Sequence, residues 1–533
     1  MAHGRPLTSG GVSVDVAPPL ADRPRTVAVR RPALLARPAG LAVAALTILA
    51  AAIRFYRLGH QGFWFDEANT ALLVHFSPGV MLGLLPRYES TPPLFYCVAW
   101  VWVRVFGDTE TGLRSLSAVA GVLTVPVLYA AANRLISRRA ALVAAALAAC
   151  SPLLIWYSQE ARSYELLVLL SAVSLWAFAH LLARPTRRAA AAWVLACALA
   201  LATHYYAILV VIPEALWLLV AHRRRRLVLI AVGLVGLCGL ALIPLAVSQE
   251  RTGRGNWIAH ASFARRIKEV VPQFAIGFGS PAYGVLEPLA FALAVFGVVL
   301  LILRATGRER RGGLIAGGLA LGGLVLNLLL VGVGIDDLLT RNMIALWVPA
   351  ALAAAGGFAA RRARLVGLGA AVALCVIGLA AAIGVARERT LQRPDWRGVA
   401  ALLGRRPTGP AATGGRAILI QHYKDLLPLG LYLPGLRFVP THRARVSELD
   451  VISFTSPPSA GFCWWGSACN LWGSQMQASY PIPGFRPVWR RHIYQFTVLR
   501  LVAVHGPVLV RAGQLAQILT TTRMRQDALL VQR

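Results

Sequence analysis

Two adjacent carboxylates follow the first long apolar segment of the sequence. Asp66 and Glu67 stand in the string RFYRLGHQGFWFDEA (54–68), directly after a run long enough to cross a bilayer. Hydrocarbon excludes carboxylates, so such a pair belongs to the membrane surface. Asp66 or Glu67 there can act as a general base that takes a proton from a hydroxyl group. A solvated loop would explain the pair equally well, but the aromatic residues around it favour a loop held among lipid headgroups.

Polar residues also interrupt the later apolar runs. The string YSQEARSY (157–164) contains Glu160 and Arg162, and a guanidinium can hold a phosphate through two parallel hydrogen bonds. Glu160 would then orient Arg162 or shape an acceptor pocket; an ordinary loop ion pair between the two is the alternative. His204 and Tyr205 can bind a phosphate or a sugar hydroxyl, or they belong to the aromatic belt of the membrane interface.

Two more sites have the same character. Arg341 precedes an apolar run, where it would meet a phosphate or extend to the surrounding lipid. Thr91 precedes Pro92 and Pro93, which fix the backbone at the entrance of a span or simply begin a helix. A lipid-linked anionic substrate needs arginines for its phosphate and a carboxylate for its acceptor. We therefore expect these residues to converge on one membrane face.

The composition requires a membrane protein with several spans. Of the 533 residues, 57% are hydrophobic and 14% are charged, with a mean hydropathy of +0.61; soluble domains have about 25% charged residues. Apolar runs of this length predict a mainly helical fold with about 11–13 transmembrane spans. The expected spans are 38–54, 92–106, 113–133, 140–155, 164–182, 189–203, 205–221, 227–247, 285–304, 313–333, 342–360 and 365–386.

The positive charge sets the orientation. The net charge of +32 comes from 54 basic and 22 acidic residues, and the arginines form short clusters between spans instead of one soluble basic face. This pattern follows the positive-inside rule and argues against a nucleic-acid partner. The clusters at 134–139, 184–188, 223–226, 304–311 and 361–364 are therefore expected in the cytoplasm. The loops at 159–162, 204–206, 249–283 and 336–341 are then extracytoplasmic.

The segment 57–112 does not fit this alternation. If 92–106 crosses the membrane fully, the cluster at 134–139 falls on the wrong side. Either 92–106 is re-entrant, or a second crossing lies near 70–86. The sequence leaves both possibilities open.

Three regions are expected along the chain. Residues 1–37 predict a disordered cytoplasmic N-terminus, and residues 38–386 the transmembrane part. Residues 387–533 predict a small extracytoplasmic α/β domain, with helices at 395–406 and 424–435 and strands at 416–421, 450–454 and 493–502. Within it, the string GFCWWGSACNLW (461–472) contains Cys463 and Cys469, which would pair in an oxidising compartment or stay free. Its tryptophans would bind glycans or form the core of the domain.

The order of the motifs resembles a known family. WFDEA, TPPLFY, YSQEARSY, THYYA, TRN before a span and DWRGVAALL, within about residues 50–405, resemble the family-39-type glycosyltransferases. These are GT-C fold membrane enzymes, related to protein O-mannosyltransferases and to bacterial aminoarabinose and galacturonic acid transferases. Where some members have Lys or His before the Pro-Pro pair, this chain has Thr91.

The resemblance implies a reaction. A sugar would move with inversion from a polyprenyl-phosphate donor to an acceptor glycan, lipid or protein, at the outer face of the cell membrane. Asp66 matches the catalytic acidic residue and Glu67 its partner, while Arg162, His204 and Arg341 match positions that line the donor phosphate. No cofactor is required, and a divalent metal is possible. The alternatives from the residues alone are a transporter or flippase for a lipid-linked sugar, for which Glu214 inside a span is the main signal, and a non-catalytic assembly or sensor protein.

Overall fold

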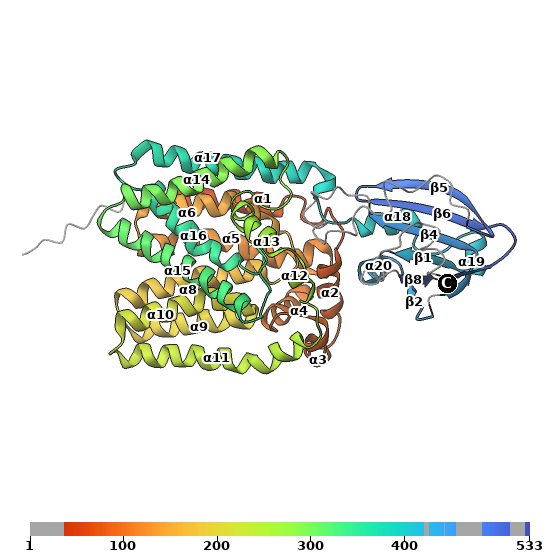
Figure 1. Cartoon of the computed structure of the whole chain (residues 1–533), viewed down its shortest axis with the longest axis horizontal. Coiled ribbons are helices and arrows are strands. Elements are labelled where there is room, and N and C mark those ends of the chain that lie inside the picture. The colour runs from red at the N-terminus through yellow and green to blue at the C-terminus, as the bar shows by residue number, and fades with distance from the viewer. Residues whose placement is uncertain (1–36, 421–425, 442, 455–481, 512–527, 533) are drawn as a thin grey trace, which may run out of the picture.

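The chain forms a long helical body joined end-on to a smaller sheet domain (Figure 1). This computed structural model describes residues 37–420, 426–441, 443–454, 482–511 and 528–532. Residues 1–36 and the segment that holds Cys463 and Cys469 lie outside these ranges, so the expectations for them remain predictions.

Each apolar run that predicts a span forms helix. The helices of the body are α1 (Arg37–Phe55), α2 (Phe65–Leu73), α3 (Pro78–Tyr88), α4 (Leu94–Phe106), α5 (Glu110–Leu135), α6 (Arg138–Cys150), α7 (Pro152–Ser158), α8 (Tyr164–Ala183), α9 (Arg187–Thr203), η2 (Tyr205–Ala207), α10 (Ile208–His222), α11 (Arg226–Glu250), α12 (Trp257–His260), α13 (Phe263–Ile276), α14 (Tyr283–Leu303), α15 (Gly307–Gly332), η3 (Ile344–Leu346), α16 (Trp347–Phe358) and α17 (Arg364–Arg387).

The predicted class, a polytopic helical membrane protein with small C-terminal sheets, is confirmed. Eight described helices are long and apolar enough to cross a bilayer, or nine if α6 and α7, bent by 56° at Ser151, form one span. Fewer than the predicted 11–13 pass this test because some predicted spans form shorter helices. The helices α4, α9 and α16 contain 13, 17 and 12 residues.

The structure resolves the open segment 57–112. The helices α2, α3 and α4 all lie at the end of the body that faces the sheet domain, and α5 is the next helix to run back along it (Figure 1). The α4 helix does not cross the body: its C-terminal Arg104 donates to Val74 O, just beyond α2, over 3.0 Å. The re-entrant alternative is therefore the better description, and it restores the alternation of arginine clusters.

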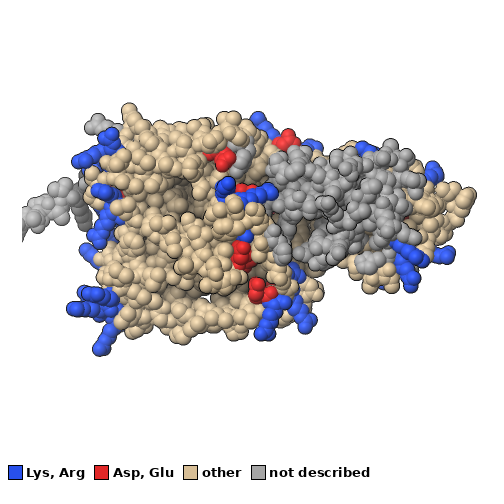
Figure 2. Space-filling view, viewed as in Figure 1, with Lys and Arg blue, Asp and Glu red and all other residues tan. Residues whose placement is uncertain are grey.

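The arginine-rich turns meet at the opposite end of the body. Arg308, at the start of α15, donates to the backbone oxygens of Asn133 and Arg134 at the end of α5. The ring of His222, at the end of α10, contacts Leu182 O near the end of α8 over 2.9 Å. Figure 2 shows basic side chains along this end, a largely uncharged middle band, and acidic side chains near the sheet domain. This distribution of charge, with basic side chains gathered at one end of an apolar band, is that of a multi-pass membrane protein.

The C-terminal part forms a six-stranded sheet with helices beside it. The strand order is β2-β8-β1-β4-β6-β5; β1 and β4 are parallel, the other pairs are antiparallel, and β3 pairs separately with β7. The elements are η4 (Arg389–Leu391), α18 (Trp396–Leu403), α19 (Pro410–Gly414), β1 (Arg416–Ile420), α20 (Leu426–Tyr432), β2 (Arg437–Phe438), β3 (Arg443–Val446), β4 (Glu448–Phe454), β5 (Phe485–Ile493), β6 (Phe496–Ala503), β7 (Val508–Arg511) and β8 (Ala528–Gln532).

The sequence located α18, α20, β1 and β4 but misread the run 493–502. The expected single strand is split by a two-residue turn, so that Ile493 ends β5 and Phe496 begins β6. Tyr494 adopts a φ of 47°. This left-handed conformation is uncommon for residues other than glycine and is favoured in two-residue hairpin turns. The apolar character of the run continues through the turn, which is why its pattern did not reveal the break.

Candidate active site

Asp66 and the two predicted arginines lie together at the end of the body that faces the sheet domain. Asp66 is in the first turn of α2. Arg341 Nη1 donates to Asp66 Oδ2 over 3.4 Å, and Arg162 Nη1 donates to the backbone oxygen of Asp66 over 3.4 Å. The side chains of Asp66 and Arg341 are 21% and 22% exposed, whereas that of Arg162 is 6% exposed. A substrate therefore reaches the first two more easily than the third.

Arg162 is held by a carboxylate that the sequence did not reveal. Glu89 accepts two hydrogen bonds from Arg162, with Nη1–Oε1 at 2.8 Å and Nη2–Oε2 at 3.1 Å. Asn69 of α2 donates to the same Glu89 Oε1 over 2.6 Å. The hydroxyl groups of Tyr96 and Thr70 lie 3.3 and 3.4 Å from Arg162 Nη1. Arg162 thus holds α2, and with it Asp66, through contacts with the backbone oxygen of Asp66 and the Thr70 hydroxyl.

Glu67 lies in a buried ion pair. Its side chain is 0% exposed, and Arg114 of α5 donates to both of its oxygens, with Nε–Oε1 at 2.7 Å. The Ala161 N–H adds a third hydrogen bond of 2.8 Å. Burial acts to raise the pKa of Glu67, but the charge and hydrogen bonds of Arg114 outweigh it, so the pKa falls below its ordinary value. This geometry favours a positioning role for Glu67 over the catalytic role expected from the sequence.

Glu160 pairs with a residue far away in sequence and not with Arg162. Arg393, between α17 and α18, donates to Glu160 Oε2 over 3.1 Å and to Trp156 O over 2.9 Å. Its guanidinium also stacks over the Trp156 ring at 4.1 Å. Burial raises the pKa of Glu160 despite the nearby Arg393. The expected orientation of Arg162 by Glu160 is therefore wrong; Glu160 joins the helical body to the segment that leads into the sheet domain.

His204 and Tyr205 border the site without reaching Asp66. The His204 ring is 3% exposed and packs against Tyr164 and Tyr206, with centroids 5.6 and 5.9 Å away. Its Nδ1 accepts from Tyr206 N over 3.2 Å, which assigns Nδ1 as the unprotonated nitrogen. Burial and the charges of Arg162 and Arg341 lower the pKa of His204 to about 3, so the ring is neutral.

Tyr205 and Thr91 are joined through Gln249 of α11. Tyr205 OH donates to Gln249 Oε1 over 2.7 Å, and Gln249 Nε2 donates to Thr91 O over 3.1 Å. The Thr91 hydroxyl lies 3.0 Å from that of Tyr96. These contacts place the turn before α4 against the end of α11.

The loop that carries Arg341 is also tied down. Arg266 of α13 donates to both carboxylate oxygens of Asp336 at 2.7 Å, and these hydrogen bonds lower the pKa of Asp336. Tyr206 OH donates to Asp337 Oδ2 over 3.0 Å, and burial raises the pKa of Asp337. Arg341 is thus presented from a fixed loop.

The sheet domain is attached to the segment between α1 and α5. Tyr432 OH of α20 donates to Glu110 Oε1 and accepts from Phe63 N, both over 2.7 Å. Gln495, in the β5–β6 turn, donates to the backbone oxygens of Arg389 and Gln392 over 2.8 Å each. The domain therefore contacts the loop immediately before Asp66.

Glu214 is a structural residue inside the helical body. Trp193 Nε1 and Ser174 Oγ donate to its two oxygens over 2.8 and 3.2 Å. These contacts join α10 to α9 and α8, so the main sequence signal for a transporter is explained by packing. Among the described residues, no three His, Cys, Asp or Glu side chains lie close enough to hold a metal ion.

Comparisons with known proteins agree with the resemblance found in the sequence. The family model described as dolichyl-phosphate-mannose-protein mannosyltransferase matches residues 90–247. Curated proteins give no match. The solved structure of ArnT from Cupriavidus metallidurans in the apo state is 16% identical, with a TM-score of 0.52, over 87% of this chain and 98% of that one. The structure of the same ArnT bound to undecaprenyl phosphate is 13% identical, with a TM-score of 0.51, over 86% and 97%.

The chain therefore has an ArnT-like GT-C fold, and within it residues 90–247 match the mannosyltransferase family model. The resemblance recognised from the motif order is confirmed. At these identities the structural likeness concerns the fold, and the roles of individual residues rest on the geometry above.

Proposed function

We propose that this protein transfers a sugar from a polyprenyl-phosphate donor to an acceptor hydroxyl, with inversion, at the extracytoplasmic end of its helical body. One observation carries the proposal: the partly exposed carboxylate of Asp66 and the partly exposed guanidinium of Arg341 lie 3.4 Å apart. This puts a proton acceptor beside a cation suited to phosphate, on a buried framework of ion pairs. The undecaprenyl phosphate in the ArnT structure supports a donor of this class.

The reaction follows from this pair. Asp66 takes the proton of the acceptor hydroxyl. At the same time the hydroxyl oxygen of the acceptor attacks the anomeric carbon from the face opposite the phosphate. The bond from that carbon to the phosphate oxygen breaks, and its electron pair leaves with the polyprenyl phosphate. Arg341 turns from Asp66 to the phosphate and stabilises the negative charge that develops there. No general acid is needed because the phosphate leaves as an anion.

We propose that the transfer needs no resident metal. The groups that the structure places next to Asp66 are the guanidiniums of Arg341 and Arg162, which repel a divalent cation. The arginines supply the charge that a metal would supply for a leaving phosphate. The protein would work as a multi-pass cell-membrane enzyme with its sheet domain outside the cytoplasm.

The test is a transfer assay with purified protein. The donors are undecaprenyl phosphates that carry mannose, arabinose, galactose or an aminosugar, and the readout is release of undecaprenyl phosphate. Asp66→Asn should lower the rate at least about 100-fold, since general-base catalysis contributes roughly that much. Asp108→Asn is the matched control, because Asp108 lies near the same end of the body and its side chain is 56% exposed.

Three outcomes would contradict the proposal. Unimpaired transfer by folded Asp66→Asn protein would exclude Asp66 as the base. Loss of activity on treatment with a chelator, with recovery on adding a divalent cation, would contradict metal-independent transfer. Movement of intact donor across liposomes without sugar release would show a flippase.

A further inference from the structure

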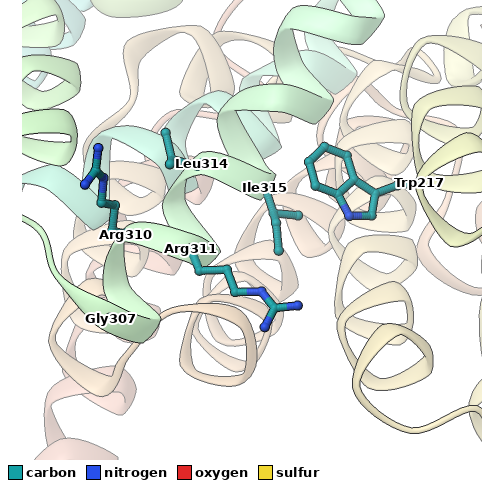
Figure 3. A pocket seen from close by; sticks show the side chains of 6 residues that line it. All are labelled: Trp217, Gly307, Arg310, Arg311, Leu314 and Ile315. Atoms are coloured by element: carbon teal, nitrogen blue, oxygen red, sulfur yellow. The ribbon is translucent and has the colours of Figure 1, made fainter. Parts of the chain in front are cut away.

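A cavity lies at the arginine-rich end of the body, at the end opposite Asp66. It has a volume of about 400 Å³ and lies between α10 and the beginning of α15 (Figure 3). Its lining residues are Trp217, Gly307, Arg310, Arg311, Leu314 and Ile315. The backbone contact of Arg308 with Arg134 fixes its place among the cytoplasmic turns.

The two arginines of the cavity are available for an anion. Both are exposed, and within the part of the chain that the structure describes neither side chain forms an ion pair or a hydrogen bond. The adjacent carboxylate, Glu309, is engaged elsewhere: it accepts from Arg361 N over 3.3 Å, and its carboxylate lies 3.8 Å from Arg361 Nε. The two positive charges are therefore free to attract an external negative group.

The rest of the lining is apolar or glycine. Arg311 and Ile315 extend from α15 toward the side on which Trp217 lies, while Arg310 leaves the helix on the other side (Figure 3). The Trp217 ring packs close to Gly318 of α15, where an added Cβ would lie 2.9 Å from it. Leu314 is 46% exposed on the same helix. A tryptophan, an exposed leucine and arginines at one depth are the features of a headgroup-level membrane surface.

We propose that this cavity binds the headgroup of an anionic phospholipid of the cytoplasmic leaflet. The lipid phosphate lies at the guanidinium of Arg311, and the upper part of an acyl chain lies along Ile315 and the Trp217 ring, while Arg310 adds positive charge from the other side of α15. A free phosphate would make no favourable contact with the apolar residues of this lining, whereas an acyl chain would. The chain's own residues 1–36 do not fit either, because they contain five arginines and two aspartates and the cavity is basic.

The two helices that form the cavity also frame the candidate active site on the other face. The α10 helix begins next to His204, and α15 leads into the loop that carries Arg341. Their backbones approach closely between these ends, since a Cβ at Gly323 would lie 2.2 Å from Leu209 O. A lipid that contacts both helices should therefore stabilise the protein as well as bind to it.

Native mass spectrometry of the purified full chain tests the proposal. Delipidated protein is titrated with dioleoylphosphatidylglycerol or dioleoylphosphatidylcholine, and bound lipids are counted. Wild type should take up the anionic lipid at concentrations where the zwitterionic lipid does not bind. Arg310→Gln/Arg311→Gln should weaken this first binding event by at least about tenfold, because the charge-assisted contact of Arg311 to phosphate and the neighbouring charge of Arg310 are lost. Its melting temperature should no longer rise with the anionic lipid.

The matched control is Arg187→Gln/Arg188→Gln, which removes two exposed arginines from the start of α9 outside the cavity. It should bind the anionic lipid as wild type does. Wild-type binding by the Arg310→Gln/Arg311→Gln variant, or an equal loss in the control, would overturn the proposal. Displacement of the lipid by millimolar inorganic phosphate, or equal affinity for both lipids, would also overturn it. None of these readouts depends on sugar transfer.

Discussion

The ion pair between Glu89 and Arg162 should stabilise the position of the α2 helix. Glu89→Gln keeps the shape of the side chain but removes its charge, and an Arg162 side chain that is 6% exposed then loses its bidentate partner. Breaking a buried pair in this way costs about 3–5 kcal/mol. The contacts of Arg162 with Asp66 O, Tyr96 and Thr70 remain. We therefore expect the lower end, a loss of about 3 kcal/mol in the free energy of unfolding.

The assay is equilibrium unfolding of the purified protein in mixed micelles, together with sugar transfer by the same preparation. Glu269→Gln is the matched control, because it removes the same charge from a more exposed ion pair within one helix. The Arg265 and Glu269 side chains are 51% and 19% exposed and lie four residues apart. Its loss should cost only about 0.3–0.5 kcal/mol. The double variant Glu89→Gln/Arg162→Gln should be less destabilised than the sum of the single variants, by about 2 kcal/mol.

Two results would refute this reasoning. One is a cost for Glu89→Gln no larger than that of Glu269→Gln. The other is strict additivity in the double variant, which would mean that the two side chains do not depend on each other. Transfer should fall with Glu89→Gln through misplacement of Asp66, so a loss of activity in protein of unchanged stability would assign Glu89 a direct role instead.

Three further predictions follow from the site. Arg341→Gln should lower kcat by about 100- to 1,000-fold, as expected when a donor to a developing anion is removed; normal kcat in a donor-saturated assay would contradict its role. His204 has a folded pKa of about 3, so between that value and its ordinary pKa of about 6.5 the unfolded chain binds a proton that the folded protein does not. Stability should therefore fall with pH by about 1.4 kcal/mol per unit below pH 6.5; an equal slope in His204→Gln, measured from pH 6.5 to 5.0, would refute this. Tyr432→Phe removes the hydrogen bonds to Glu110 and Phe63 N and should cost about 1–3 kcal/mol in unfolding free energy; unchanged stability would mean that this contact does not hold the sheet domain.

The sequence predicted the elements well because apolar runs and arginine clusters follow from the bilayer itself. It also predicted that Asp66, Arg162 and Arg341 would meet, since positive-inside counting puts their loops on one face. It missed the partners, namely Glu89, Arg114 and Arg393, because the pairing of distant segments is not encoded in local patterns. One signal was available: acidic residues are so few in a chain of net charge +32 that each one outside a solvated loop calls for a partner.

The position of β8 in the sheet determines how late in synthesis the sheet domain can fold. Residues 528–532 lie between β2 and β1, and Gln532 donates to Arg405 O and Pro434 O over 2.7 Å each. The sheet therefore cannot close until β8 has left the ribosome. The domain that holds Phe63 and Glu110 through Tyr432 is thus completed after every membrane helix has been inserted. A chain truncated after α17 would lack the contacts of Tyr432 with Phe63 N and Glu110. The loop before Asp66 therefore gains this support only after the helical body has been synthesised.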